Sequence, residues 1–247
     1  MSIDLAASRV QRIRYEIKRR VLQVVRVESV SPHFKSVTFA GDALSDFISA
    51  SFDDHVKFIL SEEGAEEEMR RDYTPRYYNA AACELTLEFA LHGDGPAADW
   101  AAQAEAGQRA TIAGPRGSFI IPMDYDWHLL VGDETAVPAI ARRLEELPAT
   151  AHAIVVLQLA DVSDRRKFQS AAKLDLHWVS NSAELMKIIR ALKLPDGEGY
   201  AWCAGEASEM AALRRLLVEE KGHSRHAIRA AAYWKRGTVG HHENLEE

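Results

Sequence analysis

The chain has 247 residues, of which 47% are hydrophobic and 27% charged, and its formal net charge is −7. This composition is that of a globular protein with room for two domains; it excludes a disordered chain, and the acidic balance argues against nucleic-acid binding. No apolar run has the length of a membrane span, and Met1–Asp4 lacks the apolar region of a signal peptide, so we expect a soluble, cytoplasmic protein.

Charge is concentrated near the N-terminus. Between Arg9 and Arg26, a single acid, Glu16, stands among seven basic residues, and five glutamates then cluster within residues 62–68. We interpret the glutamate cluster as a solvated loop between strands, because Gly64 interrupts it and it has no apolar periodicity. The basic arm is either a solvated helix or edge strand, or a contact surface for an anionic ligand or partner.

The first half of the chain consists of short segments rich in β-branched and aromatic residues, separated by Gly, Pro, Asp and Ser. This pattern predicts six strands that form a closed antiparallel barrel. A helix is expected from Pro96 to Ala102, and the turn before it contains Gly93 and Gly95; free backbone N–H groups at such a helix start can hold a pyrophosphate. The expected strands are Val21–Val30, Phe34–Ala40, His55–Leu60, Arg71–Asn79, Glu84–Leu91 and Arg109–Ala113.

The segment Arg71–Arg76 carries the strongest functional signal. In an extended strand, alternate residues share one face, so Arg71 and Tyr73 can meet one ligand, with Thr74 and Arg76 close by. A guanidinium suits a phosphate, a phenol ring stacks on a flat heterocycle, and a hydroxyl bonds a ring nitrogen or carbonyl. These are the groups that a strand needs to hold a flavin nucleotide, although an ordinary exposed strand shows the same alternation.

The pattern changes near Pro122. Compact apolar strands at Trp127–Gly132, Ala153–Leu159, Leu174–Val179 and Tyr200–Cys203 alternate with helices at Val137–Leu147, Ala183–Leu192 and Ser208–Lys221, which predicts a parallel sheet covered on both faces. Ligands of such sheets bind beyond the carboxyl ends of the strands. Two loops follow strands there, Gly132–Pro138 and Cys203–Glu206. No G-x-G-x-x-G fingerprint occurs, and both loops could be simple connections.

Six segments in order resemble the siderophore-interacting proteins, which are flavin-dependent ferric-siderophore reductases of the ferredoxin–NADP reductase superfamily. The resemblance extends along nearly the whole chain. It implies an antiparallel Greek-key β-barrel that binds FAD (residues 1–122), followed by a parallel-sheet α/β domain (residues 123–247) whose C-terminal segment returns to the flavin cleft. The segments are Asp54–Lys57, Arg71–Arg76, His92–Gly93 with Gly95–Trp100, Gly114–Phe119, Gly132–Ile140 and Tyr233–Gly237.

The resemblance assigns residues to FAD. Arg71 would contact the pyrophosphate, Tyr73 would stack on the isoalloxazine and Thr74 would bond near its reactive nitrogen, with Arg76 in the same motif. Trp234 would lie by the flavin, or else form a core aromatic pair with Tyr233. The turn that would cradle the pyrophosphate and the adenosine comprises His92, Gly93, Gly95, Ala97 and Ala98.

The loop after Gly132 departs from the wider superfamily, because it carries Asp133 and Glu134 where glycines usually admit a phosphate. Thr135 is the only member of this loop that we expect to contact a nicotinamide nucleotide. The electron donor stays open between NADH, NADPH and a ferredoxin. Arg165 and Arg166 follow a strand and could meet a 2′-phosphate, whereas Asp161 and Asp164 beside them would suit a free 2′-hydroxyl. Arg165 and Arg166 could also be solvated loop residues.

The expected reaction is reduction of a ferric siderophore, with release of ferrous iron and with no catalytic acid or base from the protein. The chelate is usually anionic, so we expect a local basic pocket made of Lys57, Arg116, Lys235 and Arg236; each could instead be a surface ion pair. The alternatives are a chelate shuttle without reductase activity and a general flavin reductase. We expect a monomer without a structural metal site, because Cys83 and Cys203 and the paired His241 and His242 lack ligand spacing.

Overall fold

The computed structural model describes residues 9–60, 68–91, 95–238 and 243–245. The chain forms two compact units. The first, here called the barrel unit, comprises Gln11–Ile120; the second, here called the sheet unit, comprises Ile121–Glu247 together with the residues that precede Gln11. The division therefore falls close to Pro122, where the sequence pattern changes.

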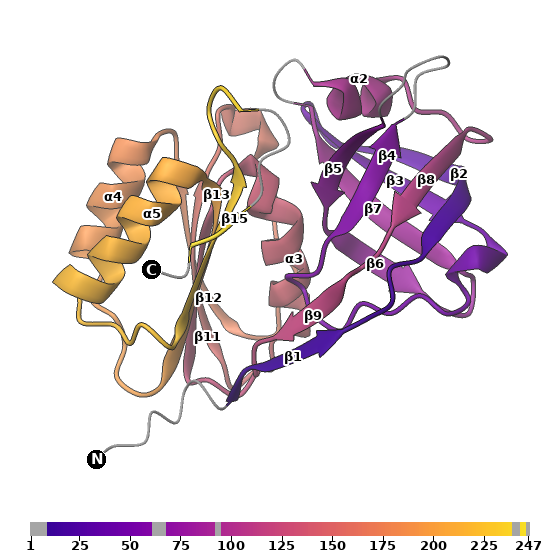
Figure 1. Ribbon diagram of the computed structural model, residues 1–247. Helices are drawn as coiled ribbons and strands as arrows, with labels where there is room; N and C mark the ends of the chain where they lie inside the picture. Colours follow the sequence, from indigo (N-terminus) through magenta and orange to yellow (C-terminus); the bar gives the residue numbers. More distant parts are fainter. Residues whose placement is uncertain (1–8, 61–67, 92–94, 239–242, 246–247) are drawn as a thin grey trace. The chain divides into compact units, whose positions relative to one another are not determined.

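The barrel unit is built on a curved antiparallel sheet of seven strands (Figure 1). Within the described residues, no backbone pairing joins its two edge strands, so the sheet is a half-barrel of the expected antiparallel class. The spatial order is β5 (Met69–Tyr73), β4 (Val56–Leu60), β8 (Arg109–Ala113), β2 (Arg19–Ser31), β3 (Phe34–Ala40), β7 (Glu84–Ala90) and β6 (Pro75–Asn79).

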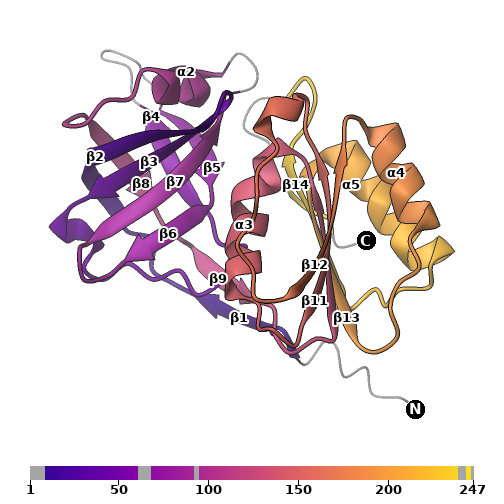
Figure 2. The same cartoon turned by 180° about the vertical axis from the view of Figure 1, so that it is seen from behind.

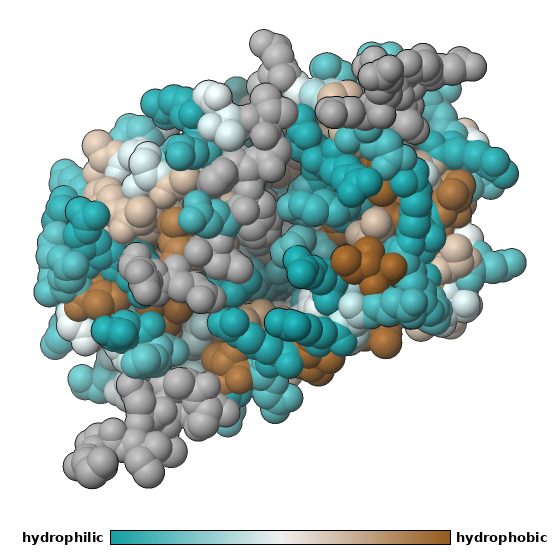
Figure 3. Space-filling model, in the orientation of Figure 1, coloured by the Kyte–Doolittle hydropathy of each residue, from teal (hydrophilic) through white to brown (hydrophobic). Residues whose placement is uncertain are grey.

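The interior of the half-barrel is aromatic. Phe39, Phe58 and Phe89 are fully buried, and Trp100 of helix α2 (Pro96–Ala102) packs on Phe58 with ring centroids 4.7 Å apart. On β2, buried Leu22 and Val24 alternate with exposed residues, as a strand with one solvated face requires. On the face seen in Figure 3, hydrophobic side chains of this unit lie scattered among hydrophilic ones.

One strand predicted for Arg71–Asn79 is in fact two. The chain leaves β5 at Tyr73, passes buried Thr74 and enters β6 at Pro75, and β5 and β6 lie at opposite edges of the sheet. Proline has no N–H to donate to a ladder and tolerates only edge or irregular positions, which explains the break. An edge strand was one of the alternatives for the basic arm, but the separate ribbon formed by β1 (Gln11–Arg14) and β9 (Gly117–Ile120) was not predicted.

The sheet unit has six strands, of which the first five are parallel and the last pairs antiparallel, so the expected parallel α/β class is confirmed. Helix α3 (Val137–Glu146) covers one face, and helices α4 (Ser182–Ala191) and α5 (Ala207–Arg215) cover the other (Figures 1 and 2). The spatial order is β12 (Lys173–Val179), β11 (His152–Gln158), β10 (Trp127–Gly132), β13 (Gly199–Glu206), β14 (Ile228–Trp234) and β15 (Glu243–Asn244).

Three details of this unit differ from the sequence prediction. β13 continues to Glu206 rather than ending at Cys203, and the predicted helix Ser208–Lys221 is α5 followed by a wider π-helical turn at Leu216–Glu220. Strand β14 was not foreseen, because its run Ile228–Trp234 is rich in alanine, which is a weak strand former. Trp234 is the last residue of β14 and therefore stands at the carboxyl end of a strand beside β13.

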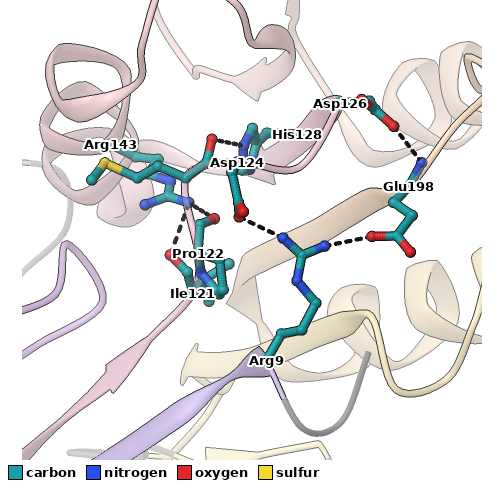
Figure 4. A network of polar contacts seen from close by, with 9 residues as sticks. Arg9, Ile121, Pro122, Asp124, Asp126, His128, Arg143 and Glu198 are labelled. Atoms are coloured by element: carbon teal, nitrogen blue, oxygen red, sulfur yellow. Dashed lines mark hydrogen bonds and ion pairs between the residues drawn. The ribbon is translucent and has the colours of Figure 1, made fainter. Parts of the chain in front are cut away.

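The segments that join the two units are anchored by arginines within the sheet unit (Figure 4). Arg9, just before β1, pairs with Asp124 and Glu198 at 2.5 Å each. Arg143 of α3 is buried, and its Nη2 donates to the carbonyl oxygens of Ile121 at 3.0 Å and of Pro122 at 2.7 Å. Each of the two segments that join the units is thus held to the sheet unit by an arginine contact.

Candidate functional site

Arg71 and Tyr73 lie on the same face of β5, because the register places them opposite Phe58 and Val56 of β4. The Tyr73 ring is partly exposed and packs against Phe89, with centroids 4.3 Å apart, and against Phe58 at 5.9 Å. This burial raises the pKa of the Tyr73 phenol. The ring is therefore a fixed, neutral aromatic surface.

The Arg71 side chain is partly exposed, and its Nη1 donates to the Arg70 carbonyl oxygen at 2.9 Å. Within the residues that the structure describes, Arg71 forms no ion pair with a carboxylate. Its neighbour Arg70, on the opposite face, instead pairs with Glu68 at 3.2 Å. The charge of Arg71 is therefore available for a phosphate.

Thr74 and Arg76 are less available than the motif suggested. Thr74 is 7% exposed at the junction between β5 and β6. Arg76 Nε donates to Glu88 Oε1 at 3.2 Å, in a pair whose side chains are 16% and 8% exposed. Removing an arginine from a mostly buried carboxylate is costly, so Arg76 serves the barrel itself. Its contact with a cofactor stays a prediction.

Helix α2 begins at Pro96, and its N-cap residue Gly95 has no side chain to cap it, so the first N–H groups of the helix are not used by a capping side chain. Ala97 is buried and Ala98 half-buried. Phe58 contacts both Trp100 of α2 and Tyr73 of β5. One aromatic cluster thus joins the two predicted halves of the cofactor site. His92 and Gly93 lie outside the described residues.

These features fit an FAD molecule. The barrel unit presents the Arg71 guanidinium, which has no carboxylate partner among the described residues, the partly exposed phenol ring of Tyr73 and a helix start without a side-chain cap. The arrangement matches a ligand with a flat ring system and a pyrophosphate.

Lys57 lies directly opposite Asp72, and its Nζ donates to Asp72 Oδ2 at 2.7 Å. Both side chains lie on the face of the sheet opposite to Arg71 and Tyr73, because they alternate with them along the strands. On the same face, Arg19 of β2 makes two hydrogen bonds to Glu68, at 2.9 and 2.5 Å. Lys57 therefore belongs to a layer of ion pairs on the outer face of the half-barrel.

Arg116 lies between β8 and β9 in a tight turn. Gly114 adopts a positive φ of 98°, and a Cβ at that position would meet the Arg116 nitrogen at 3.2 Å. The Arg116 carbonyl oxygen accepts from the Tyr15 N–H at 2.9 Å. Its side chain is exposed and forms no ion pair within the described part of the chain, so it offers a positive charge on a fixed backbone.

In the sheet unit, polar side chains gather beyond the carboxyl ends of β10, β13 and β14. Asp133, 3% exposed, accepts from the Thr135 N–H at 2.9 Å, from Thr135 Oγ1 at 2.5 Å and from Trp234 Nε1 at 2.7 Å. Burial raises the pKa of Asp133, and the hydrogen bonds from Thr135 and Trp234 offset part of that effect. The structure thus brings Thr135 and Trp234 together on one carboxylate.

This arrangement changes the role expected for Thr135. Its hydroxyl and its N–H are both donated to Asp133, so neither is open to a nucleotide. Burial and the neighbouring Asp133 also raise the pKa of Glu134 to about 7. A turn with a buried carboxylate and no free donor does not favour a dinucleotide phosphate. The contact between Thr135 and a nicotinamide nucleotide remains a prediction that the geometry does not favour.

Glu206 is the second carboxylate at this edge, and it was not singled out from the sequence. Its Oε2 accepts from the N–H groups of Ser208 at 2.8 Å and of Glu209 at 3.1 Å, and its Oε1 accepts from the Arg236 N–H at 3.3 Å. Burial alone would raise the pKa of Glu206, but these donors outweigh it and lower the pKa. The signal available in the sequence was a Ser two residues after the glutamate, which is a helix-cap pattern.

Lys235 and Arg236 directly follow β14. Both side chains are exposed, and neither forms an ion pair within the described residues. Arg165 is exposed and Arg166 half-buried beyond the carboxyl end of β11, where Arg166 stands 5.7 Å from the Phe168 ring and Phe168 stacks on Trp178 at 5.8 Å. Cations at this edge thus lie near β11, where Asp161 and Asp164 precede them, and near β14.

Among the described residues, most basic residues near the N-terminus form ion pairs, which leaves little free charge on that arm. They are Arg9, Lys18, Arg19, Arg20 and Arg26. Among the described residues, no group of three or more metal-ligating side chains is present, and no helix is long and apolar enough to cross a membrane.

Comparison with known proteins covers both units. Residues 23–119 match the family model of the siderophore-interacting FAD-binding domain, and residues 125–237 match that of the siderophore-interacting protein. The NADPH-dependent ferric-chelate reductase of Escherichia coli K12 is 34% identical over 91% of this chain and 96% of its own length. The ferric vibriobactin reductase ViuB of Vibrio cholerae is 31% identical over 88% of this chain and 90% of its own length.

Solved structures agree with these matches. A siderophore utilization protein from T. fusca superimposes with a TM-score of 0.88 and 30% identity, over 94% of this chain and 98% of that one. The ferredoxin reductase of carbazole 1,9a-dioxygenase superimposes with a TM-score of 0.67 at 18% identity, over 89% of this chain and 70% of that one. The second likeness shows the fold alone, and this fold is that of the ferredoxin reductases.

Proposed function

The chain belongs to the siderophore-interacting protein family, and from this premise we propose that it reduces ferric siderophores and so releases ferrous iron, with FAD as its cofactor. The observation that carries the proposal is the similarity to a ferric-chelate reductase over 91% of the chain. The match of residues 23–119 to an FAD-binding domain supports the cofactor.

We assign FAD binding to the barrel unit. The guanidinium of Arg71 would bind the pyrophosphate, and the fixed ring of Tyr73 would support the isoalloxazine. The N–H groups at the start of α2, near Gly95 and Ala97, would receive the remaining phosphate charge. When bound, FAD would accept two electrons as hydride from a nicotinamide and pass them on one at a time, as a ferric acceptor requires.

The protein's own part in the reaction is binding and orientation. Ferric iron enters as substrate within a chelate that is usually anionic, so exposed cations would attract and orient it. Arg116, Lys235 and Arg236 are exposed and form no ion pair within the described residues, whereas Lys57 shares its charge with Asp72. Ferrous iron binds hard oxygen ligands less tightly than ferric iron, so reduction loosens the chelate and no hydrolytic residue is needed.

We propose NADPH as the electron donor, as in the relative from Escherichia coli, which is named NADPH-dependent. Arg165 and Arg166, beyond the carboxyl end of β11, suit a 2′-phosphate, and the adjacent Phe168 offers a surface for the adenine. A ferredoxin donor has less support, because most basic residues of the N-terminal arm are already paired.

We further propose that the protein works in the cytoplasm and as a monomer. The two cysteines, buried Cys203 and half-buried Cys83, are free, which suits a reducing compartment. Gel filtration with light scattering checks the oligomeric state.

The test of the proposed function is anaerobic and spectroscopic. Protein reconstituted with FAD is mixed with NADPH, and the flavin absorbance is expected to bleach; a ferric siderophore is then expected to restore it. A chelate shuttle would bind the siderophore without this cycle, and a general flavin reductase would reduce free flavins faster than it reduces chelates.

A further inference from the structure

We propose that Asp133 and Glu206 are positioning residues that hold the Trp234–Arg236 segment and so present Lys235 and Arg236 to an anionic ferric chelate. This inference rests on the proposed function, since it concerns how the substrate cations are placed. It also gives a reason for a carboxylate where the wider superfamily carries a glycine-rich phosphate loop.

The first anchor is the contact between Asp133 and Trp234. Trp234 Nε1 donates to Asp133 Oδ2 at 2.7 Å, and the other carboxylate oxygen is held by Thr135. Asp133 is 3% exposed, so its orientation is fixed by these donors rather than by water. The space around it is also tight, because a Cβ on Gly205 would meet Asp133 Oδ2 at 2.7 Å. The indole is therefore tied to the end of β10.

The second anchor lies two residues further along. Glu206 Oε1 accepts from the Arg236 N–H at 3.3 Å, while Glu206 Oε2 is held by the first turn of α5. Glu206 is 7% exposed. The backbone at Arg236 is therefore tied to the end of β13, as the indole of Trp234 is tied to the end of β10.

Lys235 lies between the two anchors, at the start of a tight turn. The Thr238 N–H donates to the Lys235 carbonyl oxygen at 3.0 Å, and Gly237 adopts a positive φ of 76°, which side-chain-bearing residues rarely adopt. The two anchors, on Trp234 and on the Arg236 N–H, keep Lys235 and Arg236 close to the sheet edge. Because Lys235 and Arg236 are exposed and form no ion pair within the described residues, their positive charges remain available there.

The buried acids do not cancel this positive charge. Asp133 and Glu206 are saturated with N–H and O–H donors, which spread their charge over the surrounding backbone. Glu134 and Glu209 stand beside them, and burial raises the pKa of each, to about 7 for Glu134, so Glu134 carries less negative charge near neutral pH than an exposed glutamate does. Among the described residues, Lys235 and Arg236 thus keep exposed positive charges beside β14.

The experiment measures chelate binding without electron transfer. Gallium(III) complexes have the charge and shape of the ferric ones but are not reduced, so a trianionic tris-catecholate and a monocationic desferrioxamine B complex serve as probes. Binding to the FAD-loaded protein is followed by calorimetry in Asp133→Ala, Asp133→Asn, Trp234→Phe and Lys235→Ala. Asp126→Asn is the matched control, because Asp126 also accepts a backbone N–H, that of Glu198 at 2.8 Å, but at the amino end of β10.

Asp133→Ala and Trp234→Phe are each expected to weaken binding of the trianionic complex about ten-fold, with little change for the cationic one. Asp133→Asn should recover only part of the affinity, because its amide oxygen can accept from the indole but its amide nitrogen cannot accept from the Thr135 N–H. In turnover with the ferric complex, KM should rise while kcat changes little. Asp126→Asn should match the wild type in every measurement.

The positioning role would be overturned if Asp133→Ala and Trp234→Phe lost equal affinity for both complexes, or if Trp234→Phe bound the trianionic complex as tightly as the wild type does. Trp234→Phe keeps the test decisive if Asp133→Ala does not fold. Failure of the proposed function looks different: then Lys235→Ala also leaves binding of the trianionic complex unchanged, or the wild type binds neither complex.

Discussion

Lys57 and Asp72 lie directly opposite each other on β4 and β5, with the ammonium nitrogen 2.7 Å from a carboxylate oxygen. Lys57 was expected to meet an anionic chelate, yet its charge is shared with a residue between Arg71 and Tyr73. The pair faces away from those two side chains. Its contribution to substrate binding is therefore limited by Asp72.

This pairing predicts opposite effects of two substitutions. Asp72→Asn frees the Lys57 charge and should lower KM for an anionic ferric chelate about two- to five-fold. This factor corresponds to the free energy of a typical exposed ion pair, up to about 1 kcal/mol. Lys57→Ala should change KM less than Arg116→Ala, because Arg116 forms no ion pair within the described residues. Steady-state kinetics at constant ionic strength measure both. A larger effect of Lys57→Ala than of Arg116→Ala would show that Asp72 does not restrain Lys57.

Arg71→Ala should weaken FAD binding by about ten- to a hundred-fold, because a charge-assisted contact with phosphate contributes on the order of 1.5–3 kcal/mol. Fluorescence titration of the apoprotein with FAD measures the Kd. Arg70→Ala is the control: Arg70 adjoins Arg71 but faces the other way and pairs with Glu68. If both variants bind FAD equally well, Arg71 does not hold the cofactor.

Arg166→Ala should raise KM for NADPH about ten-fold and leave KM for NADH unchanged, because only NADPH carries the 2′-phosphate. Arg190→Ala, which removes a surface arginine paired with Glu220, controls for the loss of charge. An equal rise of KM for both nucleotides would contradict the assignment of Arg166 to the 2′-phosphate.

Glu134 should make stability depend on pH. Burial and Asp133 raise its pKa from the ordinary 4.5 to about 7, so between these values the folded state binds a proton that the unfolded state has lost. The free energy of unfolding contributed by Glu134 therefore falls as pH rises through this window. Glutamine never ionises, so the free energy of unfolding of Glu134→Gln should rise relative to that of the wild type by on the order of 1–3 kcal/mol as the pH increases from 4.5 to 7.

Urea unfolding at several pH values measures this difference. Glu219→Gln, at an exposed position, is the control and should show no such trend. If the free energies of unfolding of Glu134→Gln and the wild type differ by the same amount at every pH in the window, the pKa of Glu134 is not raised in the folded protein.

Arg143→Met should lower the free energy of unfolding by about 2–4 kcal/mol, because it leaves the buried carbonyl of Ile121 and that of Pro122 without their donor. Arg142→Ala, which removes an arginine paired with Glu146 on the same helix, should cost less than about 1 kcal/mol. Similar losses in the two variants would show that the linker carbonyls do not depend on Arg143.

Local patterns in the sequence predicted most of the fold. Strand alternation and Gly-Pro punctuation located the strands of the barrel unit, and α2 begins at Pro96 as expected. The division at Thr74 was missed although Pro75 can interrupt a ladder, because an edge strand also tolerates proline and because pairing across a sheet is not a local property. β14 was missed because its alanines carry little strand preference.

The candidate site was predictable in residue types but not in partners. Arg71 and Tyr73 share a face of β5, as their spacing indicated. The ion pairs of Arg76 with Glu88 and of Lys57 with Asp72 depend on which strands are neighbours, which spacing does not reveal. Asp133 stood out in the sequence as a departure from a glycine-rich loop, but its contact with Trp234 joins residues 101 positions apart.

The most direct test of the central claim is the stoichiometry of iron release. FAD-loaded protein is supplied anaerobically with limiting NADPH and excess ferric siderophore, and a ferrous-specific chelator traps the product. Because NADPH donates two electrons and ferric iron accepts one, we predict two ferrous ions trapped for each NADPH oxidised. NADPH oxidation without ferrous iron, or trapped ferrous iron that does not require FAD, would contradict an FAD-dependent ferric-siderophore reductase.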